Sequence, residues 1–244
     1  MKVVVFGGCG FLGSWLIKKL LENNLDVVVF DKEINKKLLK KIIKFSNNKI
    51  DFIKGDITNY DQVFLASQKG EVLVNLAGLM TPDCSQNPIL GNAVNVVGSI
   101  NVFEAAKNQK NKYVVYTSSG GVFGRNNPKI PFPETHYGAF KLAVEGIARA
   151  LYLEDKFSSF GLRPFVIYGP GREIGGTAGI TLACRASANN EDYTIPFSGK
   201  AGFVYVEDVT EIIFRLIQEQ PKGANVVNIN GITCDVSKII KILN

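Results

Sequence analysis

The sequence predicts an α/β fold built on a doubly wound parallel sheet with helices on both faces. Two observations carry this prediction. Short runs rich in valine and isoleucine alternate along the chain with longer stretches whose apolar residues recur at helical spacing. Several short runs, such as "KVVVFG" (2–7) and "DVVVFD" (26–31), are apolar on both faces, as strands inside a parallel sheet are. Right-handed strand–helix–strand crossovers then wind the chain in both directions from the first strand.

The elements follow in order along the chain. Strands are expected at 2–7, 26–31, 50–55, 71–78, 112–119, 158–169 and 225–229. Helices are expected between them, at 11–23, 34–45, 59–68, 91–109, 137–156 and 207–219. The alternation breaks after Gly169, where "GPGREIGGTAGI" is rich in glycine, so 170–205 is expected to be a small, partly irregular subregion. Ligands of such folds bind at the neighbouring carboxyl edge of the sheet.

Composition narrows the class of protein. The 244 residues are 46% hydrophobic and 20% charged, which fits a globular chain with a substantial core. No apolar run reaches the roughly 18 residues needed to span a bilayer, and no signal peptide precedes "KVVVFGG". The four cysteines form no CxxC pair and there is a single histidine, so neither a disulfide framework nor a metal site is expected. We therefore expect a cytoplasmic protein without a metal or a membrane span.

The net charge of +6 does not indicate nucleic-acid binding. The lysines are dispersed, and the densest group, "DKEINKKLLKKIIK" (31–44), has apolar residues at helical spacing between its charges. Such a pattern is typical of a solvated helix face. No motif that reads DNA or RNA accompanies it, so a small anionic ligand explains the surplus charge better than a nucleic-acid partner.

A glycine loop follows the first strand. Gly7, Gly10 and Gly13 recur every third residue and lead into an amphipathic helix that begins with Phe11 and Leu12. The first glycine permits a tight turn, the second lets a pyrophosphate approach the backbone, and the third lets the helix pack on the strand. The unpaired N–H groups of the helix start then face the anion. A glycine-rich turn without a ligand is the alternative.

The end of the second strand favours the dinucleotide. Asp31 lies 18 residues beyond Gly13, where a carboxylate accepts hydrogen bonds from an adenosine ribose and repels a 2′-phosphate. This favours NAD over NADP, although the neighbouring cation of Lys32 offsets part of the repulsion. Further cofactor contacts are expected at the ends of the third and fourth strands, from Asp56, Ile57, Leu76, Ala77 and Gly78.

Tyrosine, lysine and serine supply the candidate chemistry. Tyr137 and Lys141 stand four residues apart, which puts both on one helix face. A nearby ammonium and a cationic nicotinamide favour the phenolate, so Tyr137 can exchange a proton with a substrate hydroxyl. The fifth strand ends in three hydroxyl residues that can bond the substrate oxygen or the cofactor, namely Thr117, Ser118 and Ser119. A surface Tyr–Lys pair and a capping serine cluster are the alternatives.

Taken together, these motifs resemble the extended short-chain dehydrogenase/reductases, the NAD-dependent epimerase/dehydratase group. The resemblance rests on "GGCGFLG", Asp31, "GDITN", "NLAG", "VNVVGSINVFEAAK", "YTSSGGVFG", "YGAFK", "LRPFVIYGPGR" and "VYVEDV", in the family's order over nearly the whole chain. It implies a Rossmann-type doubly wound parallel sheet with a small C-terminal substrate-binding subregion. The NAD-binding Rossmann domain would be 1–169, and the substrate-binding region 170–244, of which 203–229 returns a helix and a strand to the Rossmann core.

The resemblance also implies roles for particular residues. Tyr137 is then the general base, Lys141 its partner and Ser119 the hydroxyl that orients the substrate. Cofactor contacts extend to Asn95, Pro164 and Val166. The substrate faces Met80, Thr81, Ser119, Gly120 and Arg172.

Two departures bear on the substrate. Nucleotide-sugar members carry an arginine shortly before "VYVEDV" that grips the diphosphate, and here Ala201 takes that position beside Lys200. Members also continue beyond the final "DVSKIIKILN" segment. Both departures favour a small-molecule substrate such as a polyol, a sugar, a sugar acid or a hydroxy acid.

The expected activity is an NAD-dependent oxidoreductase that transfers a hydride between nicotinamide and a secondary alcohol of a sugar-like or hydroxy-acid substrate. The alternatives are an epimerase that returns the hydride to the other face, then a dehydratase, which "TSSGG" disfavours because no carboxylate follows the serines. A cofactor-binding regulator without catalysis ranks last, because it has no need of Tyr137, Lys141 and Ser119. The helices at 91–109 and 137–156 are apolar enough to form a homodimer interface.

Overall fold

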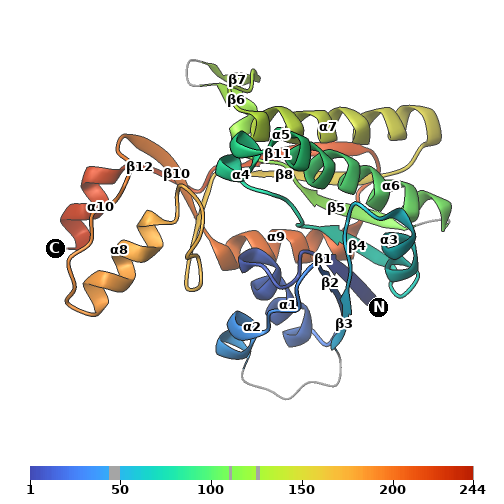
Figure 1. The fold of residues 1–244 in the computed structure, drawn as a ribbon, viewed down its shortest axis with the longest axis horizontal. Coiled ribbons are helices and arrows are strands. Elements are labelled where there is room, and N and C mark those ends of the chain that lie inside the picture. Colours follow the sequence, from blue (N-terminus) through green and yellow to red (C-terminus); the bar gives the residue numbers. More distant parts are fainter. Residues whose placement is uncertain (44–49, 110–111, 125–126, 244) are drawn as a thin grey trace.

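A computed structural model describes residues 1–43, 50–109, 112–124 and 127–243. Its main sheet has seven strands in the order β11-β8-β5-β4-β1-β2-β3 (Figure 1). All neighbours in this sheet pair in parallel. The strands are β1 (Lys2–Phe6), β2 (Asp26–Asp31), β3 (Ile50–Lys54), β4 (Val72–Asn75), β5 (Tyr113–Thr117), β8 (Ser159–Pro164) and β11 (Ala224–Ile229). The strand order reverses between β1 and β4, and ligands of open α/β sheets bind beside this reversal. The doubly wound prediction is confirmed.

Helices cover both faces of the sheet because β1 is apolar on both. Val3 and Val5 pack toward one helix layer, and Val4 and Phe6 pack toward the other. The first layer holds α1 (Phe11–Glu22), α2 (Lys37–Ile42) and α9 (Val206–Glu219). The second layer holds α3 (Tyr60–Ser67), α6 (Gly98–Asn108) and α7 (His136–Asp155). In Figure 1, α7 and α6 lie toward the top and α3 lies at the right. Each of the fully buried side chains contributes roughly 1.5–3 kcal/mol of hydrophobic stabilisation.

A smaller lobe lies beside the carboxyl edge of this sheet, at the left of Figure 1. It contains a three-stranded sheet of β9 (Val166–Tyr168), β10 (Lys200–Tyr205) and β12 (Ile232–Asp235). Two helices pack with it, α8 (Gly179–Ala188) and α10 (Val236–Leu243). Its core is small and is formed by Val166, Ile180, Phe203 and Val236. From the smaller lobe the chain returns to the larger one through α9 and β11. The division of the chain into two domains at 169/170 stays a prediction.

Two features of the elements differ from expectation. The single strand expected at 158–169 breaks at Phe165 into β8, in the main sheet, and β9, in the small sheet. Pairing with β10 takes β9 into the small sheet. The stretch 170–205, expected to be partly irregular, contains α8 and β10 with turns and loops before and between them. A short helix, α4 (Thr81–Gln86), was not expected at all.

The helix expected at 91–109 begins earlier than the sequence indicated. It runs from α5 (Pro88–Asn92) through a π-helical segment (Ala93–Val97) into α6. By length and composition alone, Pro88–Asn108 could cross a membrane. Here Val102 and Phe103 are buried against the sheet, so the helix belongs to the core of the fold. The helix expected at 34–45 is α2, and residues 44–45 lie outside the described residues.

A two-stranded hairpin of β6 (Phe123–Gly124) and β7 (Asn127–Pro131) precedes α7. It follows a 3-10 turn at Gly120–Val122, which packs directly on the start of α7. A Cβ on Gly138 would lie 2.1 Å from the carbonyl oxygen of Gly121, so only glycine allows this approach. The approach brings the chain after β5 against the first turn of α7.

Candidate active site

The glycine loop lies between β1 and α1 and is built on close backbone contacts. Gly7 has a φ of +77°, and a Cβ there would lie 2.7 Å from the amide nitrogen of Ala77. A Cβ on Gly13 would lie 2.5 Å from the carbonyl oxygen of Gly7. Gly10 begins the helix without a side-chain cap, and no acidic residue occupies the first turn. The first-turn amides of α1 are therefore left for a ligand, as an anion site at a helix start requires.

Asp31 lies at the end of β2, directly beside this loop. Its carboxylate accepts hydrogen bonds from the amide of Cys9, at 2.9 Å, and from the amide of Glu33, at 3.4 Å. These bonds hold the carboxylate next to the glycine turn, in the place where a ribose hydroxyl would be recognised. The ribose contact itself stays a prediction.

Asp56 and Lys32 face each other across the ends of β3 and β2. The Lys32 Nζ and Asp56 Oδ2 atoms are 3.6 Å apart, and the Lys32 side chain is 74% exposed, so the pair adds little stability. The amide and hydroxyl of Thr58 donate to Asp56 at 2.9 and 2.8 Å, and these bonds lower the pKa of Asp56. The Ile57 side chain packs in the core against Gly98, and the predicted contact of Ile57 with the cofactor stays a prediction.

Asn95, on the π-helical segment, lies near Lys141 beside the chain that leaves the carboxyl end of β4. Leu76 bonds back to β1, and Ala77 and Gly78 follow as the backbone that leaves the sheet. A Cβ on Gly78 would lie 2.6 Å from Asn95 Oδ1 and 3.5 Å from Lys141 Nζ. The Asn95 amide nitrogen donates to Leu79 O, Gly91 O and Cys84 Sγ. Its buried Oδ1 has no partner, so one acceptor is directed toward the lysine side of the site.

Tyr137, Lys141 and Ser119 come together at the start of α7. Thr135 caps this helix through its hydroxyl, which accepts from the amide of Gly138 at 3.1 Å. Lys141 Nζ lies 5.8 Å from the centroid of the Tyr137 ring and donates to the carbonyl oxygen of Thr117 at 2.8 Å. The Ser119 hydroxyl accepts from the amide of Gly121 at 3.0 Å and lies close enough to Tyr137 to act on the phenol by lowering its pKa. The structure therefore assembles the three residues that the sequence pattern selected.

Burial governs the charges of this group. Loss of water lowers the pKa of Lys141 to about 8, although the ammonium form still predominates at neutral pH. Burial raises the pKa of Tyr137, while the Ser119 hydroxyl and the Arg172 guanidinium act in the opposite direction. The expectation that the Lys141 ammonium and a bound nicotinamide favour the phenolate stays a prediction. In this structure Arg172 is the cation that lowers the pKa of Tyr137, and burial exceeds its effect.

Ser118 was expected to contact the cofactor, which stays a prediction, but its amide and hydroxyl already have partners within the protein. Its amide donates to Leu162 O at 2.7 Å, and its hydroxyl donates to the buried carboxylate of Glu145. Glu145 also binds Arg163 in a bidentate pair, with N–O distances of 2.7 and 2.6 Å. Ser118 is therefore used in a network that joins β5, α7 and β8, and Ser119 alone of the two serines adjoins Tyr137.

The loop after β9 carries Arg172 to the other side of the phenol. The guanidinium carbon lies 5.7 Å from the centroid of the Phe11 ring, at the start of α1. Trp15 anchors this loop, because its indole nitrogen donates to the carbonyl oxygen of Pro170 at 3.0 Å. Sequence reasoning missed this anchor, since a tryptophan on an amphipathic helix is normally interpreted as core packing. Met80 lies beside Gly175 of the same loop.

The remaining predicted contacts differ in how well the structure supports them. Thr81 begins α4 beside Met80, and Gly120 packs against the Phe165 ring. Pro164 is buried at the end of β8. The Val166 side chain lies in the core of the smaller lobe, and its predicted place beside the cofactor stays a prediction. Sequence reasoning also missed Cys84, whose buried thiol adjoins Asn95 and has its pKa raised by that burial.

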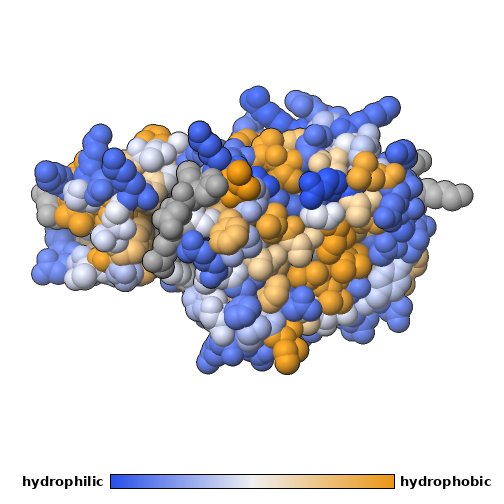
Figure 2. Space-filling model, turned by 90° about the horizontal axis from the view of Figure 1, so that it is seen from above, coloured by the Kyte–Doolittle hydropathy of each residue, from blue (hydrophilic) through white to orange (hydrophobic). Residues whose placement is uncertain are grey.

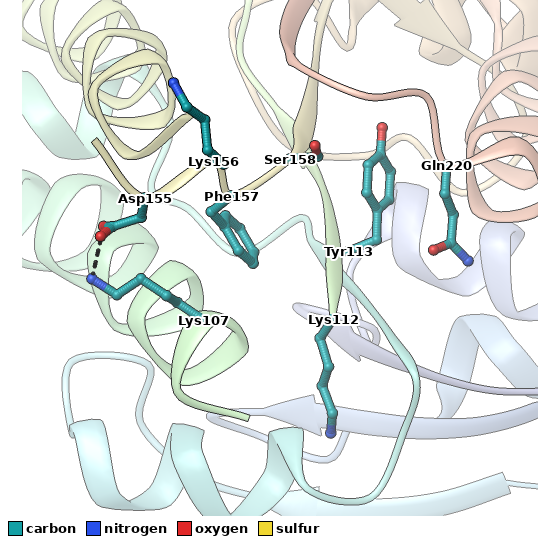
Figure 3. Close-up of a pocket in the computed structure, with 8 residues that line it drawn as sticks. All are labelled: Lys107, Lys112, Tyr113, Asp155, Lys156, Phe157, Ser158 and Gln220. Carbon is teal, nitrogen blue, oxygen red and sulfur yellow. Dashed lines mark hydrogen bonds and ion pairs between the residues drawn. The ribbon is translucent and has the colours of Figure 1, made fainter. Parts of the chain in front are cut away.

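A separate hollow lies at the opposite, amino edge of the sheet (Figure 3). Lys107, Lys112 and Lys156 line it together with Tyr113 and Phe157. Lys107 is paired with Asp155 at 3.1 Å, and the Tyr113 hydroxyl donates to Pro221 O. This hollow is far along β5 from Thr117 and takes no part in the site described above.

Comparison with known proteins identifies the family. The model of the NAD dependent epimerase/dehydratase family matches residues 3–230 of this chain. The chain belongs to this family. NAD is the cofactor that defines the epimerase/dehydratase family, so the predictions of an NAD-dependent enzyme and of its family are confirmed. The contacts of the glycine loop, Asp31 and the Tyr137 group with this cofactor stay predictions.

Relatives in the epimerase/dehydratase family differ in how much of them the chain covers. Protein CapI from Staphylococcus aureus is 31% identical over 240 residues, which span 90% of this chain and 70% of the relative. A sterol-4-alpha-carboxylate 3-dehydrogenase, decarboxylating, from Candida albicans is 34% identical over 182 residues, 69% of this chain and 51% of the relative. The chain therefore spans about half the length of the sterol enzyme.

Solved structures of the epimerase/dehydratase family share the fold. UDP-glucose 4-epimerase from Thermotoga maritima, solved with UDP-glucose, superposes with a TM-score of 0.86 at 25% identity, covering 100% of this chain and 81% of that chain. UDP-glucose 4-epimerase from Thermus thermophilus, solved with NAD, gives a TM-score of 0.85 at 22% identity, covering 100% and 82%. Both likenesses support the seven-stranded Rossmann-type architecture.

Proposed function

We propose that this protein oxidises, reversibly, a secondary alcohol of a sugar-like or hydroxy-acid substrate with NAD, and that Tyr137 is the general base. The observation that carries the proposal is the convergence of Tyr137, Lys141 and Ser119, from α7 and the turn after β5, at the carboxyl edge of the sheet. Oxidation of a secondary alcohol removes a hydride from its carbon and a proton from its hydroxyl. This group of side chains accepts or returns the proton.

The residues present fit NAD. Gly7 and Gly13 pack against neighbouring backbone and hold the turn tight, and the first turn of α1 carries no side-chain cap and no acidic residue, so its amides can donate to a pyrophosphate. Asp31 is fixed beside the loop by the Cys9 amide and supplies the acceptor for ribose hydroxyls. When bound, NAD supplies a nicotinamide ring that takes up or returns a hydride.

Side chains of the protein itself move the proton and orient the substrate. The Tyr137 phenol oxygen takes the proton from the substrate hydroxyl or returns it. The Ser119 hydroxyl donates a hydrogen bond to the oxygen of that substrate hydroxyl. Because burial raises the pKa of Tyr137, the proton-accepting form gains population as the pH rises. Alcohol oxidation is therefore expected to accelerate on the alkaline side of neutrality, and ketone reduction on the acid side.

A second candidate function is epimerisation of a nucleotide sugar. The UDP-glucose 4-epimerase from Mycolicibacterium smegmatis supports it, at 31% identity over 231 residues. The sterol carboxylate dehydrogenase supports net oxidation instead. Ala201 favours the dehydrogenase, because the position expected to grip a diphosphate lacks a cation. A dehydratase activity is the third candidate function, and a cofactor-binding regulator without catalysis is the last.

Cofactor turnover tests this proposal. The enzyme, NAD and a panel of polyols, sugars and hydroxy acids are mixed, and the absorbance of NADH is followed. Net NADH formation that is lost in Tyr137→Phe, and kept in the matched control Tyr152→Phe on the same helix, is the expected result. Conversion of a substrate without net NADH would favour the epimerase, and unchanged turnover in Tyr137→Phe would overturn the role of the phenol.

We also propose a cytoplasmic homodimer. Apolar side chains gather over the larger lobe on the side of α5, α6 and α7 (Figure 2), and Ile89, Val97 and Leu153 are 85%, 39% and 63% exposed there. The four cysteines, none of which pairs in the described residues, support a reducing compartment. Light scattering at micromolar concentration tests the dimer, and the mass of a single chain would contradict it.

A further inference from the structure

We infer that the buried ion pair of Glu145 and Arg163 positions the turn at residues 119–122, and with it the Ser119 hydroxyl, against the first turn of α7. This rests on the proposed function and adds two positioning residues to the same site. Glu145 and Arg163 act through Ser119 rather than on the substrate. The pair contacts the chain immediately before this turn and immediately after it.

The turn lies directly beside the Tyr137 ring. A Cβ on Gly121 would lie 3.3 Å from Ser119 Oγ and 3.6 Å from Tyr137 Cδ1, so Gly121 adjoins both side chains. The Ser119 hydroxyl accepts from the amide of Gly121 at 3.0 Å, which leaves its own hydrogen for a substrate oxygen. The amide of Val122 donates to Ser119 O at 3.2 Å. The backbone of the turn therefore determines where the Ser119 hydroxyl lies relative to the phenol.

Glu145 holds the chain before the turn. The Ser118 hydroxyl donates to the Glu145 carboxylate, and both residues are buried. Glu145 follows Lys141 by four residues and Tyr137 by eight, so these three side chains share one face of α7. The carboxylate thereby joins the face of α7 that carries the catalytic residues to the residue that precedes the turn.

Arg163 holds the chain after the turn. Its guanidinium carbon lies 5.1 Å from the centroid of the Phe123 ring. The Phe123 ring stacks on Phe165, with centroids 6.4 Å apart and an interplanar angle of 18°. A Cβ on Gly120 would lie 3.1 Å from the Phe165 ring, so the turn itself packs on the same pair of rings. Arg163, on β8, therefore supports the end of the turn through aromatic contacts.

Glu145 and Arg163 form one bidentate unit. Arg163 Nε and Nη2 donate to Glu145 Oε1 and Oε2 at 2.7 and 2.6 Å, and Arg163 Nη1 donates to Asn228 Oδ1 on β11 at 3.4 Å. The two side chains are only 16% and 6% exposed. Burying two charges gains little stability over packed apolar side chains. A planar bidentate pair does fix the distance and angle between its elements, which a turn that carries a catalytic hydroxyl requires.

General stabilisation of the fold is the competing explanation, because the pair also joins α7 to β8. The two explanations differ in where a disruption is felt. If the pair positions the turn, Glu145→Gln loosens residues 119–122 and lowers kcat only through Ser119. If the pair only stabilises the fold, the same variant lowers protection throughout α7 and β8, as a core variant does.

Hydrogen exchange measured by mass spectrometry tests the positioning of the turn without any substrate. Glu145→Gln and Arg163→Lys are compared with the wild type and with two controls, Glu211→Gln in a surface pair and Leu151→Ala in the core further along α7. In the first two variants the amides of the turn should exchange about tenfold faster or more, while most of α7 is unchanged. Glu211→Gln should leave the turn unchanged, and Leu151→Ala should accelerate exchange in α7 more than in the turn.

A double-mutant cycle with Ser119→Ala tests the effect on catalysis. The substrate is the compound of the polyol, sugar and hydroxy-acid panel that gives Tyr137-dependent NADH formation. Glu145→Gln should lower kcat about ten- to a hundredfold with a smaller change in KM, because a displaced hydroxyl loses its effect. In the Ser119→Ala background the same change should lower kcat by less than about twofold. The Kd of NAD should be the same in all these variants.

Three results would overturn the inference: exchange in the turn that is no faster than in the rest of α7, turnover unaffected by Glu145→Gln, or a loss of kcat that persists undiminished in the Ser119→Ala background. A higher Kd of NAD in Ser118→Ala would overturn it too, because the Ser118 hydroxyl would then serve the cofactor. Failure of the proposed function is distinguishable, since it leaves no Tyr137-dependent NADH formation while exchange in the turn still reports on the pair.

Discussion

The ammonium of Lys141 lies 5.8 Å from the centroid of the Tyr137 ring, and its nearest hydrogen-bond acceptor is the carbonyl oxygen of Thr117. One side chain therefore ties the catalytic helix to the end of β5 and places a positive charge beside the phenol. The same burial that fixes this geometry also lowers the pKa of Lys141 to about 8. Lys141 therefore affects the charge beside the phenol, the packing of α7 on β5 and the dependence of protein stability on pH.

Lys141 should make the stability of the protein depend on pH. Its folded pKa of about 8 lies below its ordinary value of 10.5, so between these two pH values the unfolded chain binds more protons than the folded protein. The free energy of unfolding therefore rises with pH across this window, by up to about 3 kcal/mol from this residue. Urea unfolding at pH 7.5 and pH 10 measures this for the wild type and Lys141→Met. Parallel pH dependence in the two proteins would contradict the burial of a charged lysine.

Two glycines of α7 should respond in opposite directions to alanine. Gly138→Ala places a Cβ against the backbone of Gly121, which displaces the turn after Ser119, so we expect a loss of about 1–3 kcal/mol and a lower kcat. Gly146 has nothing within 4 Å of its Cβ position, so Gly146→Ala should stabilise the helix by about 0.5–1 kcal/mol. Thermal unfolding and turnover of both variants check this. A well-folded, fully active Gly138→Ala variant would contradict the packing described here.

The buried pair of Glu145 and Arg163 should be the most sensitive ionic contact in the fold. Glu145→Ala leaves Arg163 half-buried without its bidentate partner and also removes the acceptor of Ser118, so a loss of about 3–5 kcal/mol is expected. Glu211, on an exposed helix face, makes surface pairs that solvent screens, so Glu211→Ala should lose much less stability than Glu145→Ala. Denaturant titrations rank the two variants, and equal losses would contradict the difference.

Asp31 should control the choice between NAD and NADP. Asp31→Ser removes the acceptor for the ribose hydroxyls and the charge that repels a 2′-phosphate. We expect the Kd of NAD to rise about tenfold or more and the preference for NAD over NADP to fall. Lys69→Ala, which removes an exposed lysine outside the predicted site, serves as the control and should leave NAD binding nearly unchanged. Calorimetry with both cofactors measures this, and an unaltered NAD affinity in Asp31→Ser would contradict the role of the carboxylate.

Local patterns predicted the parts of the fold that depend on neighbouring residues. The runs "KVVVFG" and "DVVVFD" became β1 and β2, because a strand apolar on both faces is stable only between two helix layers. The Tyr137–Lys141 spacing placed both residues on the inward face of α7 for the same local reason.

Features that depend on distant contacts could not be predicted. Ser118 and Ser119 are adjacent in sequence, and only the partners in the fold separate their roles, since Glu145 reaches one and Tyr137 the other. The break at Phe165 depends on β10, a strand 35 residues further on that the sequence pattern did not indicate. The acidity of Tyr137 likewise depends on burial and on Arg172, neither of which spacing along a helix can express.

A crystal structure of the NAD complex measures the central relationship most directly. The account predicts that the nicotinamide ring lies against Tyr137 and Lys141, with its reactive carbon facing the phenol oxygen and the pyrophosphate on the amides of the loop from Gly10 to Gly13. A nicotinamide bound away from Tyr137, or a phenol that has left the side of Ser119 in the complex, would contradict it.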